Sequence, residues 1–323
     1  MSLAAEILAI LVSKGRVSIN SLAQRLGINS TSLEVEIDRI NEDMKFIGQF
    51  DDDMVGFNQV SELLCAEKIR AGLGVFSDRF ILNVVPETGS TNDDLLDVIR
   101  LGSAQDRYIR IAENQSAGRG TKGRAWLSIP GGSLTFSILR SISSKDTKKG
   151  ISTLPLMVGL SIVRSLNAIA NIDCQLKWPN DVLFHGKKLA GVLIESVSVS
   201  GQHHVVIGVG INICIPKILM NEVDQPIADL YGLGLSIDRN VLLGKIIVEM
   251  DGMLERYFTD GFDYFRQEWC QLHAYQNQRV CFVLPDGQKL DGDILDVDAG
   301  GALVLKIAGE VKRFISGEIR INV

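Results

Sequence analysis

The sequence predicts a multidomain α/β protein made of a winged helix-turn-helix, a central domain of strands and helices, and a small β-barrel. Three observations support this prediction: apolar residues at helical spacing near the start, alternating strand and helix patterns through the middle, and closely spaced short strands at the end. The predicted boundaries are residues 1–62, 63–272 and 273–323. A chain of 323 residues can hold two or three domains of roughly 100–150 residues each.

The first 60 residues have the pattern of three short helices followed by a hairpin. Apolar residues recur at helical spacing after Leu3, and a second short helix is expected to stop at Gly27. Asn29 or Ser30 can cap the third helix. Residues 47–57 can fold as a β-hairpin around an acidic tripeptide. Three helices and a wing in this order predict a winged helix-turn-helix.

The middle and the end of the chain differ in the spacing of their elements. In the middle we expect a buried helix at 154–170 and an amphipathic helix at 241–258. Near the end, turn residues such as Pro285 and Gly287 separate short strands, which is typical of a small β-barrel. The strands expected in the two regions lie at residues 108–112, 133–138, 189–195, 204–215, 280–284, 290–297, 302–307 and 311–315.

Composition limits the partners and the compartment. The net charge of −6 gives no chain-wide attraction to nucleic acid or to an anionic membrane, so any anion-binding site must be local. Five cysteines without close pairs argue against a disulfide framework and a zinc site, and favour a reduced cytoplasm. The sequence shows no signal-peptide pattern, and we expect no membrane-spanning segment.

The most informative stretch is residues 115–126, in which Arg119, Lys122 and Arg124 alternate with glycines directly after an expected strand. Glycine permits unusual backbone angles and close approach to a ligand. Arginine, lysine and consecutive backbone N–H groups bind oxyanions, and Trp126 offers a face to a flat ring. The spacing matches neither a P-loop nor a dinucleotide-binding turn. The alternative interpretation is a flexible, solvated basic turn.

A second stretch combines Lys177 and Asp181 with a downstream lysine, Lys188. Asp181 is expected in a turn, where a carboxylate can hold Mg²⁺ together with substrate phosphates. Lys188 opens an apolar strand, and a lysine at such a rim can pair with a carboxylate or a phosphate. The alternative is a proline-containing hairpin with surface lysines.

Two further stretches have both a binding and a structural interpretation. Gly208 and Gly210 interrupt an apolar strand followed by Asn212, whose amide can bind either a purine edge or neighbouring backbone. Residues 88–93 carry hydroxyl and acidic side chains, which are typical first of a helix N-cap and secondly of ligand contacts.

Five motifs follow one another along the chain: GSTN at 89–92, GRGTKGRAW at 118–126, KWPND at 177–181, KLAGVLIE at 188–195 and GVGIN at 208–212. In this order they resemble the motifs of the bacterial biotin–protein ligases, whose best-known member is also the biotin operon repressor. The resemblance runs from the first helices to residues 317–319. It implies a winged helix, a central α/β ligase domain with a mixed sheet, and an SH3-like C-terminal barrel.

The resemblance implies a biotin–protein ligase that activates biotin with ATP and Mg²⁺ to biotinyl-5′-AMP and transfers biotin to a lysine. The implied partners are the biotin carboxyl carrier protein of acetyl-CoA carboxylase, operator DNA, and a second copy of the chain when the adenylate is bound. Two alternatives stay open. One is the related lipoate–protein ligase, which the basic loop and the KWPND motif disfavour. The other is a biotin-sensing regulator without transfer activity.

The resemblance also assigns site residues. Arg119, Lys188 and Asp181 are implied to be catalytic, with Asp181 beside Mg²⁺. Many family members have arginine where this chain has Thr121, so we expect weaker retention of the adenylate or replacement of that arginine by Lys122. The implied biotin contacts are Ser90, Thr91, Asn92, Gln115, Arg119, Gly120, Thr121 and Lys188, and the implied ATP or adenylate contacts are Lys122, Arg124, Trp126, Lys177, Asn180 and Asn212.

The charge of the first 60 residues argues against DNA binding, because five basic and nine acidic residues give a net charge of −4. The expected recognition helix, residues 30–40, carries three acids and a single cation, Arg39, and the wing carries the acidic tripeptide 51–53. Phosphate contacts supply most non-specific affinity for DNA. Two interpretations follow: a weak or highly selective repressor module, or a retained scaffold that influences the ligase without binding operators.

Overall fold

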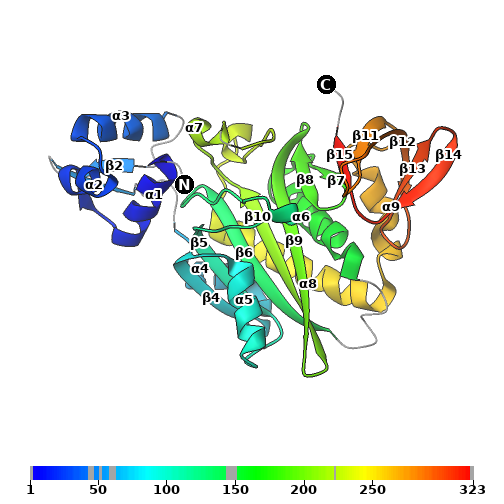
Figure 1. Ribbon diagram of the computed structural model, residues 1–323. Helices are drawn as coiled ribbons and strands as arrows, with labels where there is room; N and C mark the ends of the chain where they lie inside the picture. The colour runs from blue at the N-terminus through cyan, green and yellow to red at the C-terminus, as the bar shows by residue number, and fades with distance from the viewer. Residues whose placement is uncertain are drawn as a thin grey trace.

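The computed structural model describes residues 3–42, 47–50, 53–57, 63–142, 151–221 and 223–320, and their strands form three sheets (Figure 1). A three-stranded sheet lies in the N-terminal part, a seven-stranded sheet at the centre and a five-stranded sheet in the C-terminal part. Figure 1 shows the central sheet between the other two parts, so the chain passes through the molecule from one end to the other.

Three helices and a hairpin form the N-terminal part, as expected from the sequence. Gly27 ends the second helix in the left-handed conformation, with a φ of 69°, and Asn29 caps the third helix by accepting a hydrogen bond from Ser32 N at 2.7 Å. Asp51 and Asp52, expected in the wing, lie outside the described residues. The elements are α1 (Leu3–Lys14), β1 (Val17–Ser18), α2 (Ile19–Leu26), α3 (Ser30–Ile40), β2 (Ile47–Phe50) and β3 (Met54–Phe57).

The central sheet is mixed, and this confirms the prediction. Strands β4 and β5 pair in parallel, whereas the other neighbours in the order β4-β5-β6-β10-β9-β8-β7 pair antiparallel. The register of β9 and β10 places Gly191 opposite Gly210, and Leu193 opposite Gly208. The strands are β4 (Ile81–Thr88), β5 (Tyr108–Gln115), β6 (Ser133–Ile142), β7 (Gln175–Lys177), β8 (Asp181–Phe184), β9 (Lys187–Val199) and β10 (Gln202–Asn212).

Helices cover both faces of the central sheet. Val205 shares a core with α6 and α8, whereas its neighbour Val206 packs with Leu95 of α5 on the opposite face. Because side chains alternate along a strand, Gly208 and Gly210 face the α5 side with Val206. The helices are α4 (Ala66–Leu73), α5 (Thr91–Arg100), α6 (Leu154–Ala170), α7 (Lys217–Met220) and α8 (Arg239–Asp260), with short 3₁₀ turns η1 (Gly74–Arg79), η2 (Thr121–Gly123), η4 (Ile151–Thr153) and η5 (Tyr231–Leu233).

The segment Ile151–Ala170, which contains α6, is long and apolar enough to cross a membrane by length and composition. No such segment is expected from the sequence. In the structure 67% of this stretch is buried, and α6 packs against the central sheet and α8. Its surroundings are those of the core helix of a folded domain.

Five antiparallel strands form the C-terminal sheet, in the order β14-β13-β12-β11-β15. Four of them were expected from the sequence, and β15 was not. The sheet shares one apolar core with the central part, and Trp178 Nε1 donates a hydrogen bond to Gly301 O at 2.9 Å across the junction. The elements are α9 (Asp263–Gln271), β11 (Arg279–Val283), β12 (Lys289–Val297), β13 (Leu303–Ile307), β14 (Glu310–Phe314) and β15 (Glu318–Arg320).

The N-terminal part is packed against the central part through two segments. Ile129, Cys214, Ile215 and Leu219 belong to the same apolar cluster as the buried residues of α1, α2 and α3. The first segment follows the basic stretch 115–126, and the second follows β10. The N-terminal helices therefore contact the chain directly downstream of two sequence motifs.

Gly72 on α4 and Gly244 on α8 let these two helices approach each other closely. A Cβ atom at Gly244 would lie 2.7 Å from the carbonyl carbon of Gly72. We therefore expect Gly244→Ala to lower the free energy of unfolding by about 1–3 kcal/mol, because the helices must move apart. On the same helix, a Cβ atom at Gly252 would have no neighbour within 4 Å. Gly252→Ala should therefore raise the free energy of unfolding by up to about 1 kcal/mol. Urea unfolding measures both changes, and equal effects would contradict the close approach.

His273 follows α9 and lies between Trp269, whose ring centroid is 4.9 Å away, and Tyr275. Burial lowers the pKa of His273 from 6.5 to about 4. The unfolded chain therefore takes up a proton near pH 6.5, whereas the folded chain does so only near pH 4. The free energy of unfolding that the neutral His273 contributes above pH 6.5 is lost as the pH falls from 6.5 to 4. We expect this loss to be about 3 kcal/mol.

The variant His273→Phe removes this titration and keeps an aromatic ring in the site. Urea unfolding at pH 7 and pH 4.5 should show that the variant loses less stability on acidification than the unsubstituted chain. An equal loss in both proteins would show that other groups account for the pH dependence.

Candidate functional site

A solvent-open cavity of about 440 Å³ lies where the start of α5, the basic stretch 115–126 and strands β9 and β10 meet. The motifs that lie far apart in the sequence therefore come together here. Residues assigned from the sequence that line the cavity are Ser90, Thr91, Asn92, Gln115, Arg119, Gly120, Thr121, Trp126, Asn180 and Lys188.

Glycines on the two central strands make room for this cavity. A Cβ atom at Gly208 would lie 2.3 Å from Asn92 Oδ1, and one at Gly210 would lie 2.3 Å from the indole ring of Trp126. At Gly191, a Cβ atom would lie 3.2 Å from the same ring. Trp126 and Asn92 can therefore lie directly on the backbone of the sheet only because these positions lack side chains.

Polar side chains at the start of α5 form one end of the cavity. Gln115 Oε1 accepts hydrogen bonds from Thr91 N at 2.8 Å and from Thr91 Oγ1 at 3.1 Å. Ser137 Oγ donates to Asn92 Oδ1 at 2.6 Å. Ser90 is the N-cap residue of α5, but its side chain makes no capping hydrogen bond. Ser90 therefore stands at the N-cap position, as the capping interpretation expects. Its buried side chain does not cap the helix and lines the cavity instead.

The basic stretch folds back on itself as a narrow loop over the cavity. Trp126 N donates to Gly118 O at 2.8 Å, and Gly120 N donates to Arg124 O at 2.7 Å. Lys122 at its tip has a left-handed backbone, with a φ of 60°. The indole Nε1 of Trp126 is buried and has no hydrogen-bond partner among the described residues. The loop is therefore an ordered turn in this structure, unlike the flexible turn that the sequence left open.

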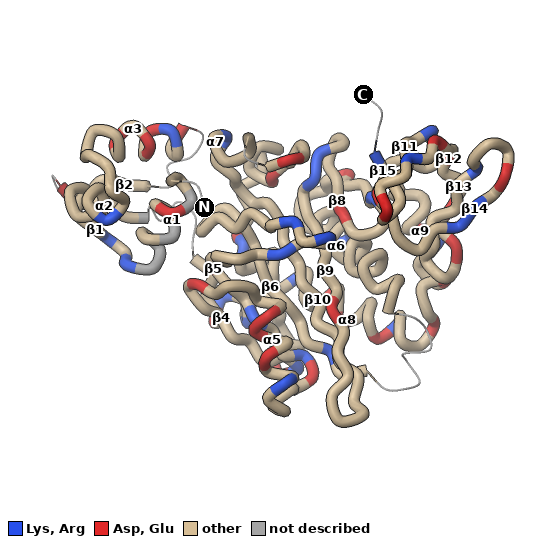
Figure 2. The backbone as a smooth tube through the Cα atoms, in the orientation of Figure 1, with Lys and Arg blue, Asp and Glu red and all other residues tan. Residues whose placement is uncertain are grey.

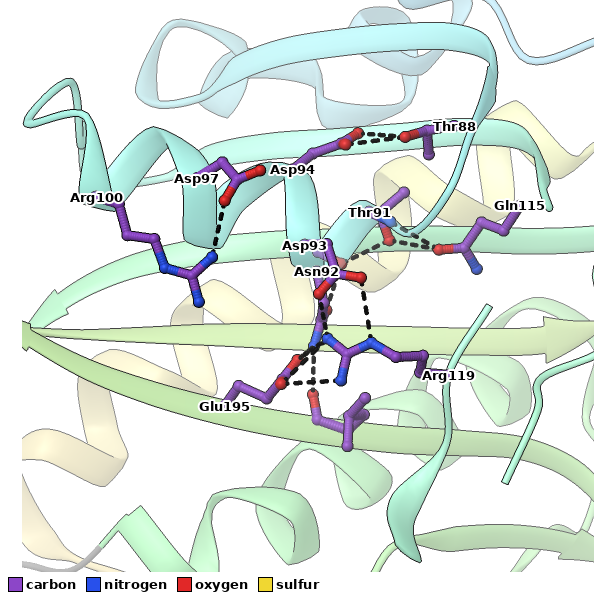
Figure 3. A network of polar contacts seen from close by, with 12 residues as sticks. Thr88, Thr91, Asn92, Asp93, Asp94, Asp97, Arg100, Gln115, Arg119 and Glu195 are labelled. Carbon is purple, nitrogen blue, oxygen red and sulfur yellow. Dashed lines mark hydrogen bonds and ion pairs between the residues drawn. The ribbon is translucent and has the colours of Figure 1, made fainter. Parts of the chain in front are cut away.

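Arg119 reaches from this loop to two carboxylates (Figure 3). Its guanidinium pairs with Glu195 on β9 at 2.8 Å and with Asp93 on α5 at 2.5 Å. The hydrogen bonds that Arg119 donates to Glu195 and Asp93 raise its pKa above the ordinary value, although burial opposes this change. Neither carboxylate was assigned a role from the sequence, where Glu195 appears only as the last letter of a motif and Asp93 as a helix-cap residue.

Lys188, which lines the cavity, forms an ion pair with Asp181, which does not line it. Their Nζ and Oδ1 atoms are 2.7 Å apart, and both side chains are mostly buried. Lys188 Nζ lies 5.5 Å from the centroid of the Trp126 ring, so ammonium and indole share one space. Asp181 is the first residue of β8, which corrects the expectation that it lies in a turn. Asn180 before it donates to Val192 O at 2.8 Å.

Five assigned residues, Asp181 among them, do not line the cavity. Lys122 and Arg124 pair with Glu318 of β15, at 3.4 Å and 2.6 Å. Asn212 donates to the carbonyl oxygens of Lys188 at 3.2 Å and Ala228 at 3.1 Å, so its amide already has backbone partners. The fifth, Lys177, opposes Asp181 in the β7–β8 pair.

Burial and neighbouring charges perturb two groups beside the cavity. Burial lowers the pKa of Lys177, although Asp181 and Glu318 oppose this change. Burial alone would raise the pKa of Glu318, but the hydrogen bond and charge of Arg124 and Lys122 bring it below its usual value. Glu318 therefore stays ionised and is a carboxylate that sequence reasoning did not assign, since only folding brings β15 to the loop.

Asp181 is the only candidate metal ligand assigned from the sequence. Within the described ranges, no group of three or more His, Cys, Asp or Glu side chains could hold a metal ion by itself. Asp181 Oδ1 is buried and lies 2.7 Å from Lys188 Nζ. The geometry of this ion pair is not that of a hydrogen bond, and Oδ1 accepts no hydrogen bond from the described residues. One such carboxylate fits a Mg²⁺ ion that is held mainly by substrate phosphates and water.

Comparison with known proteins identifies relatives over most of the chain. A sequence profile of the biotin/lipoate A/B protein ligase family matches residues 84–212. The chain is 33% identical over 243 residues to the biotin–[acetyl-CoA-carboxylase] ligase of Mycobacterium tuberculosis, covering 74% of this chain and 88% of the relative. It is 28% identical to the bifunctional ligase/repressor BirA of Salmonella typhimurium over 93% of this chain and 92% of the relative.

A similar fold is found in a solved structure. The biotin protein ligase from Aquifex aeolicus in complex with biotin and ATP superposes with a TM-score of 0.63 and is 28% identical, covering 74% of this chain and 97% of that chain. The relatives and this structure agree with the family that the motif order indicated.

The close packing of Trp126 on Gly210 can be tested by adding one methyl group. We expect Gly210→Ala to displace the indole from the sheet, because its Cβ atom would lie 2.3 Å from the ring. The tryptophan fluorescence of the variant should shift to the red as the ring becomes solvated. In a Trp126→Phe background the same substitution should leave the spectrum unchanged, and a Gly210→Ala spectrum equal to that of the unsubstituted chain would contradict the packing.

Proposed function

Since this chain belongs to the biotin/lipoate A/B protein ligase family, we propose that it is an ATP-dependent biotin–protein ligase. It activates biotin as biotinyl-5′-AMP and transfers biotin to a lysine of the biotin carboxyl carrier protein of acetyl-CoA carboxylase. The observation that carries this proposal is the single cavity onto which the start of α5, the basic loop and Lys188 converge. Relatives named as biotin ligases, and one solved with biotin and ATP, support it.

Three functional domains follow from this proposal. Residues 1–62 are a winged helix-turn-helix, residues 63–272 are the catalytic domain and residues 273–323 are an SH3-like domain. The order of helices and the β1-β3-β2 sheet support the first assignment. The five short antiparallel strands support the last. All five cysteines are free thiols, which suits a reduced cytoplasm.

Biotin occupies the end of the cavity at the start of α5. The hydroxyl and amide groups there can satisfy both the donors and the acceptor of a ureido ring. The carboxylate of biotin points to Lys188, whose Nζ lies 5.5 Å from the centroid of the Trp126 ring. The biotin-binding residues in this proposal are Ser90, Thr91, Asn92, Gln115, Arg119, Gly120, Thr121 and Lys188.

ATP binds between the basic loop and β15. Lys122 and Arg124 face its phosphates, which replace Glu318 as the partner of these cations. Trp126 stacks on the adenine, with the free N–H of its indole available to an acceptor. Lys177, Asn180 and Asn212 border this half of the site. Asn212 donates a hydrogen bond to Ala228 O, so it supports the backbone at Ala228. It is also a candidate contact of the adenine.

The first step joins two anions, because the carboxylate oxygen of biotin attacks the α-phosphorus of ATP and pyrophosphate leaves. Lys188 and the loop cations offset the repulsion between the reactants, and the cavity holds them at reacting distance. Mg²⁺ bound beside Asp181 with the phosphates would supply further positive charge. In the second step the amine of the acceptor lysine attacks the acyl carbon and AMP leaves, while Lys188 polarises the carbonyl.

A second function, repression of transcription, is supported by the relative named a ligase/repressor, which aligns with 93% of the chain. The charge of α3 argues against repression, because Glu34 and Asp38 are exposed and Arg39 lies 3.5 Å from Glu36. Figure 2 shows acidic positions in red along α3. The domain is thus either a weak or highly selective operator-binding module, active in an adenylate-bound homodimer, or a scaffold that influences the ligase without binding operators. A gel shift with the chain's own biotin-operon promoter at stated salt, with biotinyl-AMP, separates the two.

The proposed activity is tested with a purified carrier domain. Biotin and ATP together should label one lysine of the carrier, and omission of either should abolish labelling. Lipoate in place of biotin should give no labelling. Equal labelling by lipoate would identify a lipoate ligase, and binding of biotin without any transfer would identify a sensing regulator.

Lys188 and its neighbour Lys187 form a matched pair for mutagenesis. Lys188 faces the cavity, whereas Lys187 is exposed. We expect Lys188→Ala to slow both half-reactions about 100-fold or more, because the charge that stabilises each transition state is lost. Lys187→Ala should retain the unsubstituted rates in the same single-turnover assays. Unchanged rates for Lys188→Ala would remove its assignment.

Thr121 lines the cavity where many family members have arginine. We expect Thr121→Arg to slow release of biotinyl-5′-AMP about tenfold, because a guanidinium adds a charge-assisted hydrogen bond to the phosphate. The release rate is measured by chasing bound, labelled adenylate. Identical rates would indicate that Lys122 already fulfils that role in this chain.

A further inference from the structure

Arg119 joins three separate parts of the chain around the mouth of the cavity. It leaves the basic loop, contacts Asp93 in the first turn of α5 through Nε at 3.2 Å, and contacts both oxygens of Glu195 on β9 at 2.8–3.1 Å (Figure 3). Glu195 also accepts a hydrogen bond from Asn92 Nδ2 at 2.7 Å. Because Asn92 lines the cavity, the network reaches from the loop to the cavity wall.

The charges in this network limit what Arg119 can do. One guanidinium faces two carboxylates, so the group as a whole is negative where an anionic substrate would approach. Arg119 therefore cannot act as a free cation toward a carboxylate or a phosphate while both pairs are formed. Lys188, with a single carboxylate partner, and the loop cations Lys122 and Arg124 are better placed for that task.

The same network fixes the loop in space. Arg119 forms a backbone bridge with Ala125 across the loop, and the next residue, Trp126, packs on the glycines of the sheet. Fastening the side chain of Arg119 to α5 and β9 therefore also holds the loop above the cavity.

We propose that Asp93 and Glu195 are positioning residues that fasten Arg119, and with it the loop 116–126, across the mouth of the cavity. Their effect on catalysis rests on the proposed ligase function, whereas the fastening itself does not. An adenylate beneath the loop can leave only when the loop opens. The two carboxylates thereby set how slowly biotinyl-5′-AMP escapes and meets water.

The chain offers a matched control on the same helix. Asp97 pairs with Arg100 at 2.8 Å, but both side chains are mostly exposed and neither lines the cavity. Asp97→Asn removes the same charge from α5 as Asp93→Asn does. A general effect of charge on the helix would appear in both variants, and an effect on the loop only in Asp93→Asn.

The first measurement is hydrogen exchange of the ligand-free full chain. In Asp93→Asn and in Glu195→Gln, amides of residues 116–126 should exchange about tenfold faster, because one charge-assisted pair has become a weaker neutral one. Asp97→Asn should match the unsubstituted chain. Unchanged exchange in both test variants would overturn the fastening, whether or not the chain is a ligase.

The second measurement is the release of preformed adenylate. Asp93→Asn and Glu195→Gln should each release biotinyl-5′-AMP about tenfold faster, with the KM for biotin raised and the rate of transfer from bound adenylate unchanged. In an Arg119→Gln background, Glu195→Gln should add no further acceleration. Faster exchange with unchanged release would overturn the catalytic half of the proposal. Absence of adenylate formation in every protein, including the unsubstituted chain, would instead overturn the proposed function.

Discussion

The site depends on the lack of side chains at three positions of two adjacent strands. Gly191, Gly208 and Gly210 leave the surface of the sheet open on the side that faces α5. Asn92 from the helix and Trp126 from the loop occupy that space. A β-carbon at Gly208 or Gly210 would push one or the other away from the strands. The glycines therefore allow the start of α5, the basic stretch 115–126 and Lys188 to meet at the cavity.

Four cations of the site have a carboxylate partner in this structure. Lys188 pairs with Asp181, Arg119 with two acids, and Lys122 and Arg124 with Glu318. An acidic chain with a net charge of −6 can therefore build a cationic site, because the charges are balanced locally. In the proposed function, anionic substrates bind by replacing some of these carboxylates, so the site attracts anions while its cations are paired in the ligand-free chain. That proposal implies that the pairs with Glu318 and Asp181 exchange partners, whereas the Arg119 pairs remain in place.

The sequence predicted the parts whose pattern is local. Capping of α3 by Asn29, the end of α2 at Gly27 and the buried helix α6 follow from a few neighbouring residues. The family resemblance carried by the order of the central motifs also located ten cavity residues, although no single motif assigned them. Strand β4 was missed, since it is an edge strand without clear alternation of buried and exposed residues.

Long-range pairing explains most of what sequence reasoning missed at the site. Arg124 and Glu318 are 194 residues apart, and no local pattern connects them. Asp93 has the appearance of an ordinary acidic residue in the first turn of a helix, and only the fold brings it to Arg119. From the sequence, the amide of Asn212 could bind either a purine edge or neighbouring backbone. In the structure it donates to two backbone carbonyl oxygens.

In the proposed reaction, one cavity brings the carboxylate of biotin together with a nucleoside triphosphate, ATP. Biotin-dependent exchange of labelled pyrophosphate into ATP measures this first step without any acceptor protein. The account predicts exchange only when biotin and Mg²⁺ are both present, and none with lipoate. Binding of biotin with no exchange at any ATP concentration would contradict it, because the two anions would then bind without being brought together.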